Sequence, residues 1–483
     1  MPLILGTNSI KDTGYNVANS LRFNGGSSDY LNRTNVASPT NQFKWTFSFW
    51  LKISDISDSQ GSGNQMLFSD FTDASNRGTI FLESDDTLVI SDRISNSFTF
   101  KYQTTRKFRD VSAWYHIVVN HDRTLSSPAT KVFVNGVQET SFGTSTNPSQ
   151  NGTSFFNKGS QGSLIGKYGG GNEFYNGYIC EAVWIDGSVL DADQFGEFDE
   201  DSPTVWKPKD VSGLTFGNNG FYLDFENSGA LGTDVSGNSN NFTVNNLTSI
   251  DQSTDTCTNN FATLNPLVPS GGGFQSNSSV FSEGNLKFLT NNSSSNYGMC
   301  FSSIGVNSGK WYIEAKLDNK GGEDVFGISA QNITSTANYI GGGAYSWGFY
   351  QNGTYYHNNN GSAYDNNSWS TNDILRLALD LDNNKLYFGL NATWQNSGNP
   401  ESGATGTGAV SITDPSSTDT GHYFIGYGNA SNSSNGAVSF NFGNGYFGTT
   451  AVSSAGTNAS NNGIFEYDVP TGYTALSTKG LNL

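Results

Sequence analysis

The segment DILRLALDLDNNKLYFGLNATWQ, residues 373–395, predicts a β-hairpin with one buried face. Leucine recurs at every second position from Leu375 to Leu381, and this period of two fits a strand, because no helix buries residues so spaced on one side. Asn383 and Asn384 are expected to turn the chain, since asparagine tolerates the positive φ that a two-residue hairpin turn demands. Beyond the turn the alternation resumes and completes the strand pair.

A second segment shows the same pattern. Residues 114–138, WYHIVVNHDRTLSSPATKVFVNGVQ, alternate from Tyr115 to Val119, cross a polar loop and resume before Asn135. Two hairpins of this kind, far apart in the chain, indicate two antiparallel β domains. We therefore predict an all-β fold of two tandem β-sandwiches with an irregular connector, and such domains more often recognise surfaces than transform substrates.

Composition agrees with this fold and limits the partners. Aromatic residues make up 13% of the 483 residues and charged residues only 14%, as expected of many short strands joined by polar turns. The net charge of −18 argues against nucleic acid and anionic membranes, because both would be repelled. The sequence holds no apolar stretch of about 18 residues to span a membrane, and its MPLILGTNSIKD start lacks the basic region of a secretory signal.

Three cysteines, Cys180, Cys257 and Cys300, are too few and too widely spaced for a disulfide framework. Apolar flanks predict that they are small core residues. The sequence shows no Cys/His spacing typical of zinc sites. We therefore expect no structural metal of this kind.

The order of segments in residues 1–200 resembles the laminin-G-like, concanavalin-A-like jelly roll family. The resemblance rests on the strand of Phe23, the aromatic strand 47–52, Trp114 to His116, Val134 to Gly136 and the strand Gly177 to Asp186. It implies a β-sandwich of the jelly-roll type.

Residues 271–483 resemble the SPRY domain, a bent β-sandwich. Five blocks occur in the family order: Gly309–Asp318, Glu323–Ala330, Tyr345–Asn359, residues 373–395 and Val438–Gly445. The loops are rich in Asn, Ser and Gly, whereas eukaryotic SPRY domains grip peptides with charged or hydrophobic loops. A peptide ligand is therefore not expected.

Residues 201–270 are predicted to form a connector with short strands. Its phrases VWKP, NGFYLDF, DVSGNSNNFTVNNL and TNNFATLNPL resemble bacteriophage proteins of marine type, in which a jelly roll, this connector and a second sandwich follow one another. The resemblance implies that the chain belongs to a phage particle.

Glu197, Asp199 and Asp201 are the best catalytic candidates. They superficially match the alternating carboxylates of concanavalin-like glucanases, which act as nucleophile and general acid. Pro203 follows at once, and the preceding LDADQF has a helical pattern capped by Asp191, so a solvated domain end fits better. We predict no enzymatic activity.

The predicted binding residues are aromatic. Tyr345, Tyr355, Tyr356 and His357 lie among Asn and Gly, and flat rings flanked by amides suit sugar binding, whereas alternation assigns Trp347 to the core.

We expect no cofactor. A bound Ca²⁺ ion is the single possibility that the sequence leaves open. In laminin-G-like domains Ca²⁺ can sit at the sandwich rim, and Asp122 and Asp186 are candidate ligands here. Solvated turn residues are the alternative for both.

Together these patterns predict a non-enzymatic virion protein of a tailed bacteriophage, carried outside the tail or capsid as a tail fibre, tail-associated protein or capsid appendage. Host-surface glycans, bound during adsorption, and other virion proteins are the expected partners. We also expect a homo-oligomer, with a trimer as one option, made in the host cytoplasm without a signal peptide. The alternatives are a purely structural decoration or connector of the virion, a cellular surface adhesin and a glycan hydrolase.

Overall fold

The computed structural model describes residues 14–35, 38–56, 63–127, 129–267, 279–290, 298–331, 339–365, 367–429, 434–456 and 462–482. These residues form strands and short 3-10 helices and contain no α-helix, so the all-β prediction is confirmed. Among them, no helix is long and apolar enough to cross a membrane. The described residues divide into a first unit that ends at Asn260 and a second unit that begins at Phe261.

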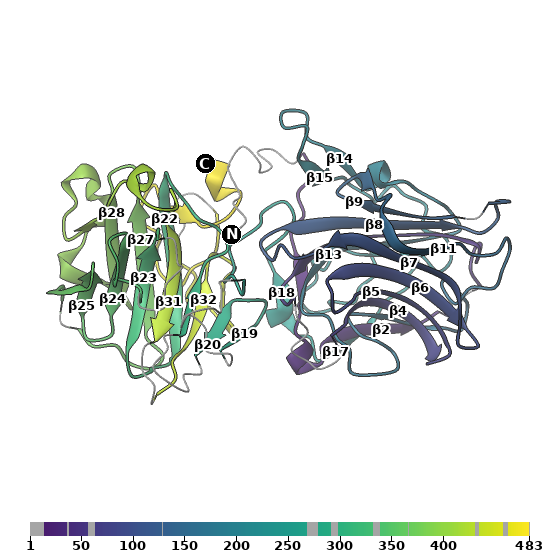
Figure 1. The fold of residues 1–483 in the computed structure, drawn as a ribbon, viewed down its shortest axis with the longest axis horizontal. Coiled ribbons are helices and arrows are strands. Elements are labelled where there is room, and N and C mark those ends of the chain that lie inside the picture. Colours follow the sequence, from purple (N-terminus) through teal and green to yellow (C-terminus); the bar gives the residue numbers. More distant parts are fainter. Residues whose placement is uncertain are drawn as a thin grey trace. The chain divides into compact units, whose positions relative to one another are not determined.

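Two antiparallel sheets build the first unit (Figure 1). Sheet A has the order β10 (Val137–Gln138), β9 (Ala129–Val134), β8 (Trp114–Asp122), β3 (Lys44–Ile53), β13 (Gly177–Asp186), β1 (Ser20–Phe23) and β18 (Gln252–Ser253), with β16 (Phe221–Leu223) also paired to β13. Sheet B has the order β11 (Phe142–Thr146), β7 (Ser97–Lys107), β6 (Thr87–Ile94), β5 (Asn76–Leu82), β4 (Gln65–Asp73), β12 (Gly162–Ile165), β2 (Tyr30–Thr34) and β17 (Thr243–Asn245).

A hydrophobic core fills the space between sheets A and B. The odd-numbered residues of β3 from Trp45 to Leu51 point into it, as their alternation predicts, and meet sheet B side chains such as Phe68. The rings of Trp45 and Trp184 stack with centroids 5.0 Å apart. The even-numbered residues of β3 face the other side of sheet A.

The chain after residue 200 continues the first unit as far as Asn260. β16 pairs with β13, β17 with β2 and β18 with β1. A small hairpin of β14 (Gly196–Phe198) and β15 (Trp206–Pro208) brings Trp206 into a second apolar cluster with Trp50 and Cys180 on the outer face of sheet A. The predicted connector thus spans the division between the two units.

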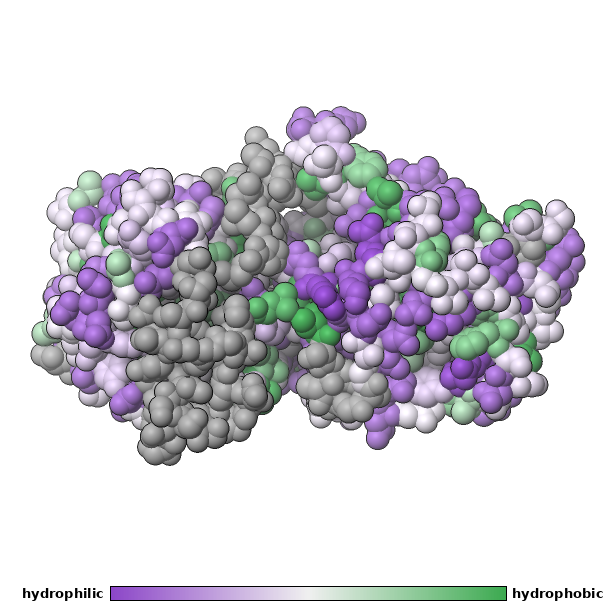
Figure 2. Space-filling view, viewed as in Figure 1, coloured by the Kyte–Doolittle hydropathy of each residue, from purple (hydrophilic) through white to green (hydrophobic). Residues whose placement is uncertain are grey.

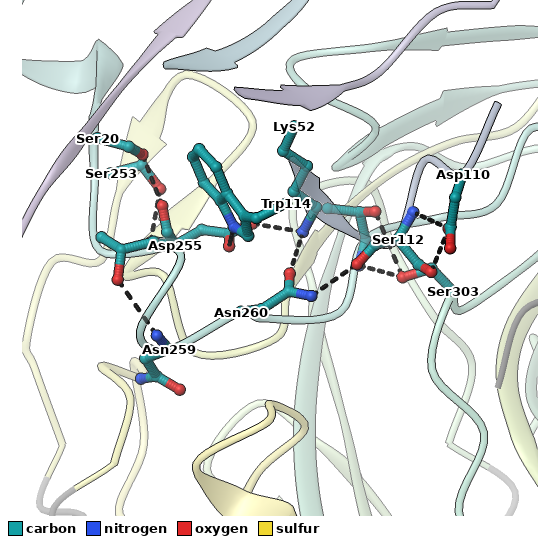
Figure 3. A network of polar contacts seen from close by, with 12 residues as sticks. Ser20, Lys52, Asp110, Ser112, Trp114, Ser253, Asp255, Asn259, Asn260 and Ser303 are labelled. Atoms are coloured by element: carbon teal, nitrogen blue, oxygen red, sulfur yellow. Dashed lines mark hydrogen bonds and ion pairs between the residues drawn. The ribbon is translucent and has the colours of Figure 1, made fainter. Parts of the chain in front are cut away.

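A buried lysine ties this late segment to sheet A (Figure 3). The Nζ atom of Lys52, on a side chain 1% exposed, lies 2.7 Å from Asp255 Oδ2 and donates to Asn260 Oδ1, also at 2.7 Å. Trp114 Nε1 donates to the other Asp255 oxygen at 3.1 Å, and Asn260 Nδ2 donates to the Ser112 carbonyl at 2.6 Å. Burial lowers the pKa of Lys52, and the Asp255 carboxylate opposes that shift. The network holds residues 255–260 against β3.

The second unit is also a pair of sheets. Sheet C has the order β19 (Val280–Ser282), β20 (Lys287–Leu289), β32 (Ala437–Asn441), β22 (Lys310–Asn319), β27 (Ile374–Asp380), β28 (Lys385–Leu390) and β29 (Thr393–Trp394), with β30 (Val410–Ser411) beside β28 and β35 (Thr474–Ala475) beside β22. Sheet D has the order β21 (Gly298–Phe301), β31 (Phe424–Asn429), β23 (Asp324–Ser329), β24 (Ser346–Tyr350), β25 (Thr354–His357) and β26 (Asn360–Ala363). β33 (Tyr446–Phe447) and β34 (Thr450–Ala451) pair separately. Leu375, Leu377 and Leu379 lie in the core between sheets C and D.

Short 3-10 helices connect strands in both units. They are η2 (Gly25–Ser27), η3 (Ala192–Gln194), η4 (Ser249–Asp251), η5 (Gln395–Ser397), η6 (Pro400–Thr405), η7 (Pro415–Ser417) and η8 (Gly480–Asn482).

The predicted two-residue turn at Asn383 and Asn384 is wrong. Strand pairing ends at Asp380, so the loop spans residues 381–384, and only Asn384 has a positive φ, 54°. The Asp380 carboxylate accepts from the backbone N–H of Asn383 at 3.1 Å and from its side chain at 2.9 Å, which stabilises the longer loop. In the first unit, residues 135–136 do form a two-residue turn with both φ values positive.

The three cysteines are buried and free, as predicted. Cys180 and Cys257 lie together, with their sulfur atoms 3.8 Å apart.

We expect Asp255→Ala to lower the free energy of unfolding of the first unit by about 3–5 kcal/mol, because the Lys52 ammonium would stay buried without its carboxylate. Urea unfolding followed by tryptophan fluorescence measures the loss. Lys131→Ala, which breaks the exposed pair with Asp191, is the control and should have little effect. Equal losses in the two variants would contradict the structural role of the network.

Candidate functional site

The four residues predicted to bind sugar gather at one edge of sheet D. Tyr345 directly precedes β24, and Tyr355, Tyr356 and His357 lie on β25, between β24 and β26. β26 is the edge strand of the sheet and is exposed along its whole length. The structure thus brings the four residues together in the sheet, but it distributes them between its two faces.

Three of the four side chains lie on the core side. Tyr345 and Tyr355 pack against the core between sheets C and D, and the Tyr355 ring lies 5.8 Å from that of Tyr364. The His357 ring stacks on Trp347 with centroids 4.4 Å apart and planes 6° apart. Each of these rings is half-buried and has a packing partner.

Tyr356 projects to the outer face of sheet D, where two other tyrosines contact it. The centroids of Tyr350 and Tyr339 lie 5.5 Å and 5.9 Å from that of Tyr356, and both rings meet it edge-on. The Tyr339 hydroxyl donates to Asn359 Oδ1 at 2.8 Å. We call Tyr339, Tyr350 and Tyr356 the tyrosine platform; all three are half-buried, so part of each stays at the surface.

Glycine on both neighbouring strands makes room for the Tyr356 ring. Its cross-strand partners are Gly348 on β24 and Gly361 on β26. A Cβ atom added at Gly361 would lie 3.0 Å from two ring carbons of Tyr356, so the ring lies close over the backbone of β26. A ring held in this way offers a flat apolar surface, and the exposed amides of residues 358–360 lie beside it in the chain.

The hydroxyl group of Tyr350 stays protonated at neutral pH. Burial and, to a smaller extent, the nearby Glu323 carboxylate raise the pKa of Tyr350 to about 12. A neutral hydroxyl both donates and accepts hydrogen bonds, which suits a sugar hydroxyl as partner.

The two calcium candidates are engaged with hydrogen-bond donors. Asp186 is buried, and its carboxylate accepts from the backbone N–H groups of Thr40 at 2.7 Å and Asn219 at 3.0 Å. Asp122 accepts from Thr124 Oγ1 at 2.6 Å and lies 3.4 Å from Lys44 Nζ. In the described part of the chain, His, Cys, Asp and Glu form no group of three that could hold a metal ion.

The acids considered for catalysis lie on the β14–β15 hairpin. Lys207 Nζ lies 3.8 Å from the exposed Glu197 and 3.3 Å from Asp199. Asp199 also accepts the backbone N–H of Asp201 at 3.1 Å, which closes the turn. The expected helix there is only the three-residue η3, and Asp191 makes no side-chain cap.

Glu181 on β13 is a buried acid that sequence patterns did not single out. Its Oε2 atom accepts from the hydroxyls of Tyr222 at 2.8 Å and Tyr15 at 3.1 Å, and its φ of 52° lies at a bulge in the pairing of β13 with β3. Burial raises the pKa of Glu181 to about 7, although both hydroxyls act to lower it. Its hydrogen bonds stabilise the bulge.

Two family models match the chain. Residues 24–194 match the concanavalin A-like lectin/glucanases superfamily, and residues 310–406 match the SPRY domain. The chain carries a concanavalin A-like domain and a SPRY domain. One match lies in each unit, and both domain types favour a binding function. No curated protein is significantly similar to the chain.

Solved structures resemble parts of the chain at low identity. The SPRY domain of human HERC1 is 15% identical, with 32% of this chain and 87% of that chain covered and a TM-score of 0.25. A SAP-like pentraxin from Limulus polyphemus is 16% identical, with 37% and 81% covered and a TM-score of 0.28. A putative carbohydrate binding protein from Bacteroides ovatus ATCC 8483 is 15% identical, with 48% and 59% covered and a TM-score of 0.32. At such scores these likenesses carry no functional argument.

We expect the stability of the first unit to depend on pH through Glu181. Its folded pKa of about 7 lies above the ordinary value of 4.5, so the folded state holds the proton more tightly between these pH values. Its contribution to stability is full below about pH 4.5 and is lost as the pH rises through about 7. Denaturant unfolding from pH 4 to 8 should show a smaller decline for Glu181→Gln than for the wild type. Parallel curves would contradict this assignment.

Proposed function

We propose that this chain is a non-enzymatic protein on the outside of a bacteriophage particle and that it binds host-surface glycans through the tyrosine platform. The platform carries the proposal. Tyr356 lies over a glycine backbone, has two tyrosine rings beside it at steep angles, and has exposed asparagines next to it in the chain. Stacking on a ring combined with amide hydrogen bonds is a chemistry that suits neutral sugars.

The phage assignment rests on the sequence. The phrases between residues 204 and 267 resemble marine-type phage proteins in which the same two kinds of sandwich occur in the same order. Low charge and polar turns suit a surface that is exposed to the medium after lysis.

We further propose that the protein is displayed in several copies. A single platform of three rings offers a small contact area, so one site would bind a sugar weakly. Several copies on one particle turn later binding events into intramolecular ones and raise the overall affinity without any new contact. A homo-oligomer, with a trimer as one option, would supply such display.

We expect Tyr356→Ala to weaken glycan binding by about tenfold, because the stacking surface is lost. Tyr356→Phe keeps the ring and should bind within about twofold of the wild type. A glycan array on host polysaccharide fragments, followed by calorimetry on the best ligand, measures the change. Tyr30→Ala is the control, because Tyr30 is a half-buried tyrosine of the first unit. Wild-type affinity for Tyr356→Ala, or release of reducing ends from the polysaccharide, would overturn the proposal.

We expect mass spectrometry of purified particles from a lysate of the producing host to detect peptides of this chain at a constant ratio to the major capsid protein. Shaving intact particles with protease should remove some of these peptides, because the protein is proposed to lie outside. Absence from particles would leave a cellular adhesin as the better assignment.

A further inference from the structure

A row of four cross-strand partners crosses the outer face of sheet B. Phe71 on β4 pairs with Arg77 on β5, Arg77 with Arg93 on β6, and Arg93 with Phe98 on β7. Partners in register project from the same face of a sheet, so the two arginines lie side by side between two phenylalanines. We call these four residues the arginine row. It belongs to the first unit and is separate from the tyrosine platform.

Aromatic rings support both guanidinium groups. Arg93 Cζ lies 4.0 Å from the centroid of Phe98, and Arg77 Cζ lies 5.3 Å from that of Tyr168. Lys101 Nζ lies 5.7 Å from the Phe98 centroid and adds a third cation. A guanidinium group stacked on a ring is held in place while its N–H edge stays free to pair with an anion.

These positive charges are not matched by carboxylates. Like charges directly opposite each other destabilise a sheet, and no ion pair of the described residues involves Arg77, Arg93 or Lys101. Arg93 donates to Asn96 Oδ1 at 3.4 Å, and Arg77 donates to a backbone carbonyl. Hydrogen bonds from Asn76 and Ser75 lower the pKa of the Asp73 carboxyl group. The nearby Arg77 charge lowers the same pKa by less.

The next row of the same face supplies no acid. Its members, in register, are Ser69, Thr79, Ser91 and Lys101. The hydroxyls of Thr79 and Ser91 lie 2.9 Å apart and hydrogen-bond to each other. In a chain with a net charge of −18, three cations without a carboxylate partner form a local exception.

Polar residues such as Asp73, Ser95 and Asn96 are exposed next to the row. Hydrophilic and weakly polar residues cover most of the visible face of the first unit in Figure 2, with hydrophobic residues scattered among them. Phe98 is nevertheless 43% exposed at one end of the row. An exposed ring beside unmatched cations suits a ligand that is both anionic and partly apolar.

We propose that the arginine row, with Lys101, binds an anionic polysaccharide. Sulfate or carboxylate groups of the polysaccharide pair with the N–H edges of Arg77 and Arg93, and a sugar ring lies against Phe98. Three cations are enough to pair with a short segment of an anionic polysaccharide. Duplex nucleic acid carries about one charge per 1.7 Å, and the rest of this acidic protein would repel it. Screening over about 10 Å at 0.1 M salt limits the repulsion that a short anionic segment meets.

Dextran, carboxymethyl dextran and dextran sulfate test the proposal, because they share one backbone and differ in charged group. The full-length protein should bind one or both charged forms, more weakly as salt rises, and should not bind dextran at this site. We expect Arg77→Gln and Arg93→Gln each to weaken that binding about five- to tenfold. Carboxymethyl dextran and dextran sulfate distinguish carboxylate from sulfate as the preferred group.

The control is Lys131→Gln, which removes one exposed positive charge elsewhere in the first unit. It should change binding less than about twofold. This control shows whether binding depends on the arginine row or only on the net charge of the protein. Thermal unfolding separates binding from structure, since relieving the Arg77–Arg93 repulsion should leave the melting temperature unchanged or raise it. Phe98→Ala offers a second test on an exposed side chain and should also weaken binding.

Three results would overturn the proposal. The first is equal loss of binding in Lys131→Gln and Arg93→Gln. The second is a fall in melting temperature of both arginine variants together with unchanged binding in Phe98→Ala. The third is tighter binding of single-stranded oligothymidine than of either charged dextran. Tyr356→Ala should keep wild-type binding to the charged dextrans, so failure of this site and failure of the tyrosine platform are distinguishable.

Discussion

A positive charge buried in a sheet has to be matched, and in the first unit the matching group comes from far along the chain. Lys52 lies on the central strand β3, while Asp255 and Asn260 lie more than 200 residues later. Their contacts make residues 201–260 a structural part of the sandwich. Without that segment, Lys52 would lose its contacts with Asp255 and Asn260, and the apolar outer face of sheet A would lose side chains such as Trp206 and Tyr222. The jelly roll therefore needs its supposed connector.

Much of the fold is predictable from the sequence because burial imposes a period of two. The alternation around Trp45 and Leu377 identified both cores, and the structure places those side chains as expected. The sequence also predicts short strands in residues 201–270, but it does not predict which strands they pair with, since β16, β17 and β18 have only two or three residues each. A strand that short shows no periodicity, and its pairing depends on partners that are distant in sequence. The length of the loop after Asp380 does not follow from alternation either, because hydrogen bonds to the Asp380 side chain stabilise a four-residue loop.

The two proposed binding surfaces are predictable from the sequence only where a single strand carries all the residues that define them. The sequence predicts Tyr356 only as one of four candidates, and the strand places it on the opposite face from Tyr355 and His357. Tyr350 joins it through the register of β24 and β25, and Tyr339 joins it from a loop without any repeating pattern. The arginine row is invisible in the sequence, because its members come from four strands and only the register reveals that Arg77 faces Arg93.

The Lys52 network also determines how late in translation the first unit can finish folding. Asp255 leaves the ribosome 203 residues after Lys52, which at usual elongation rates is a delay of about 10–40 s. During that interval β3 can pair with β8, but Lys52 lacks the Asp255 carboxylate, and its face of the sheet lacks the apolar side chains that residues 201–260 supply. That face has to stay in contact with water or a chaperone until residues 201–260 have been synthesised. The first unit therefore completes its folding only after its last segment has been made, and not strand by strand.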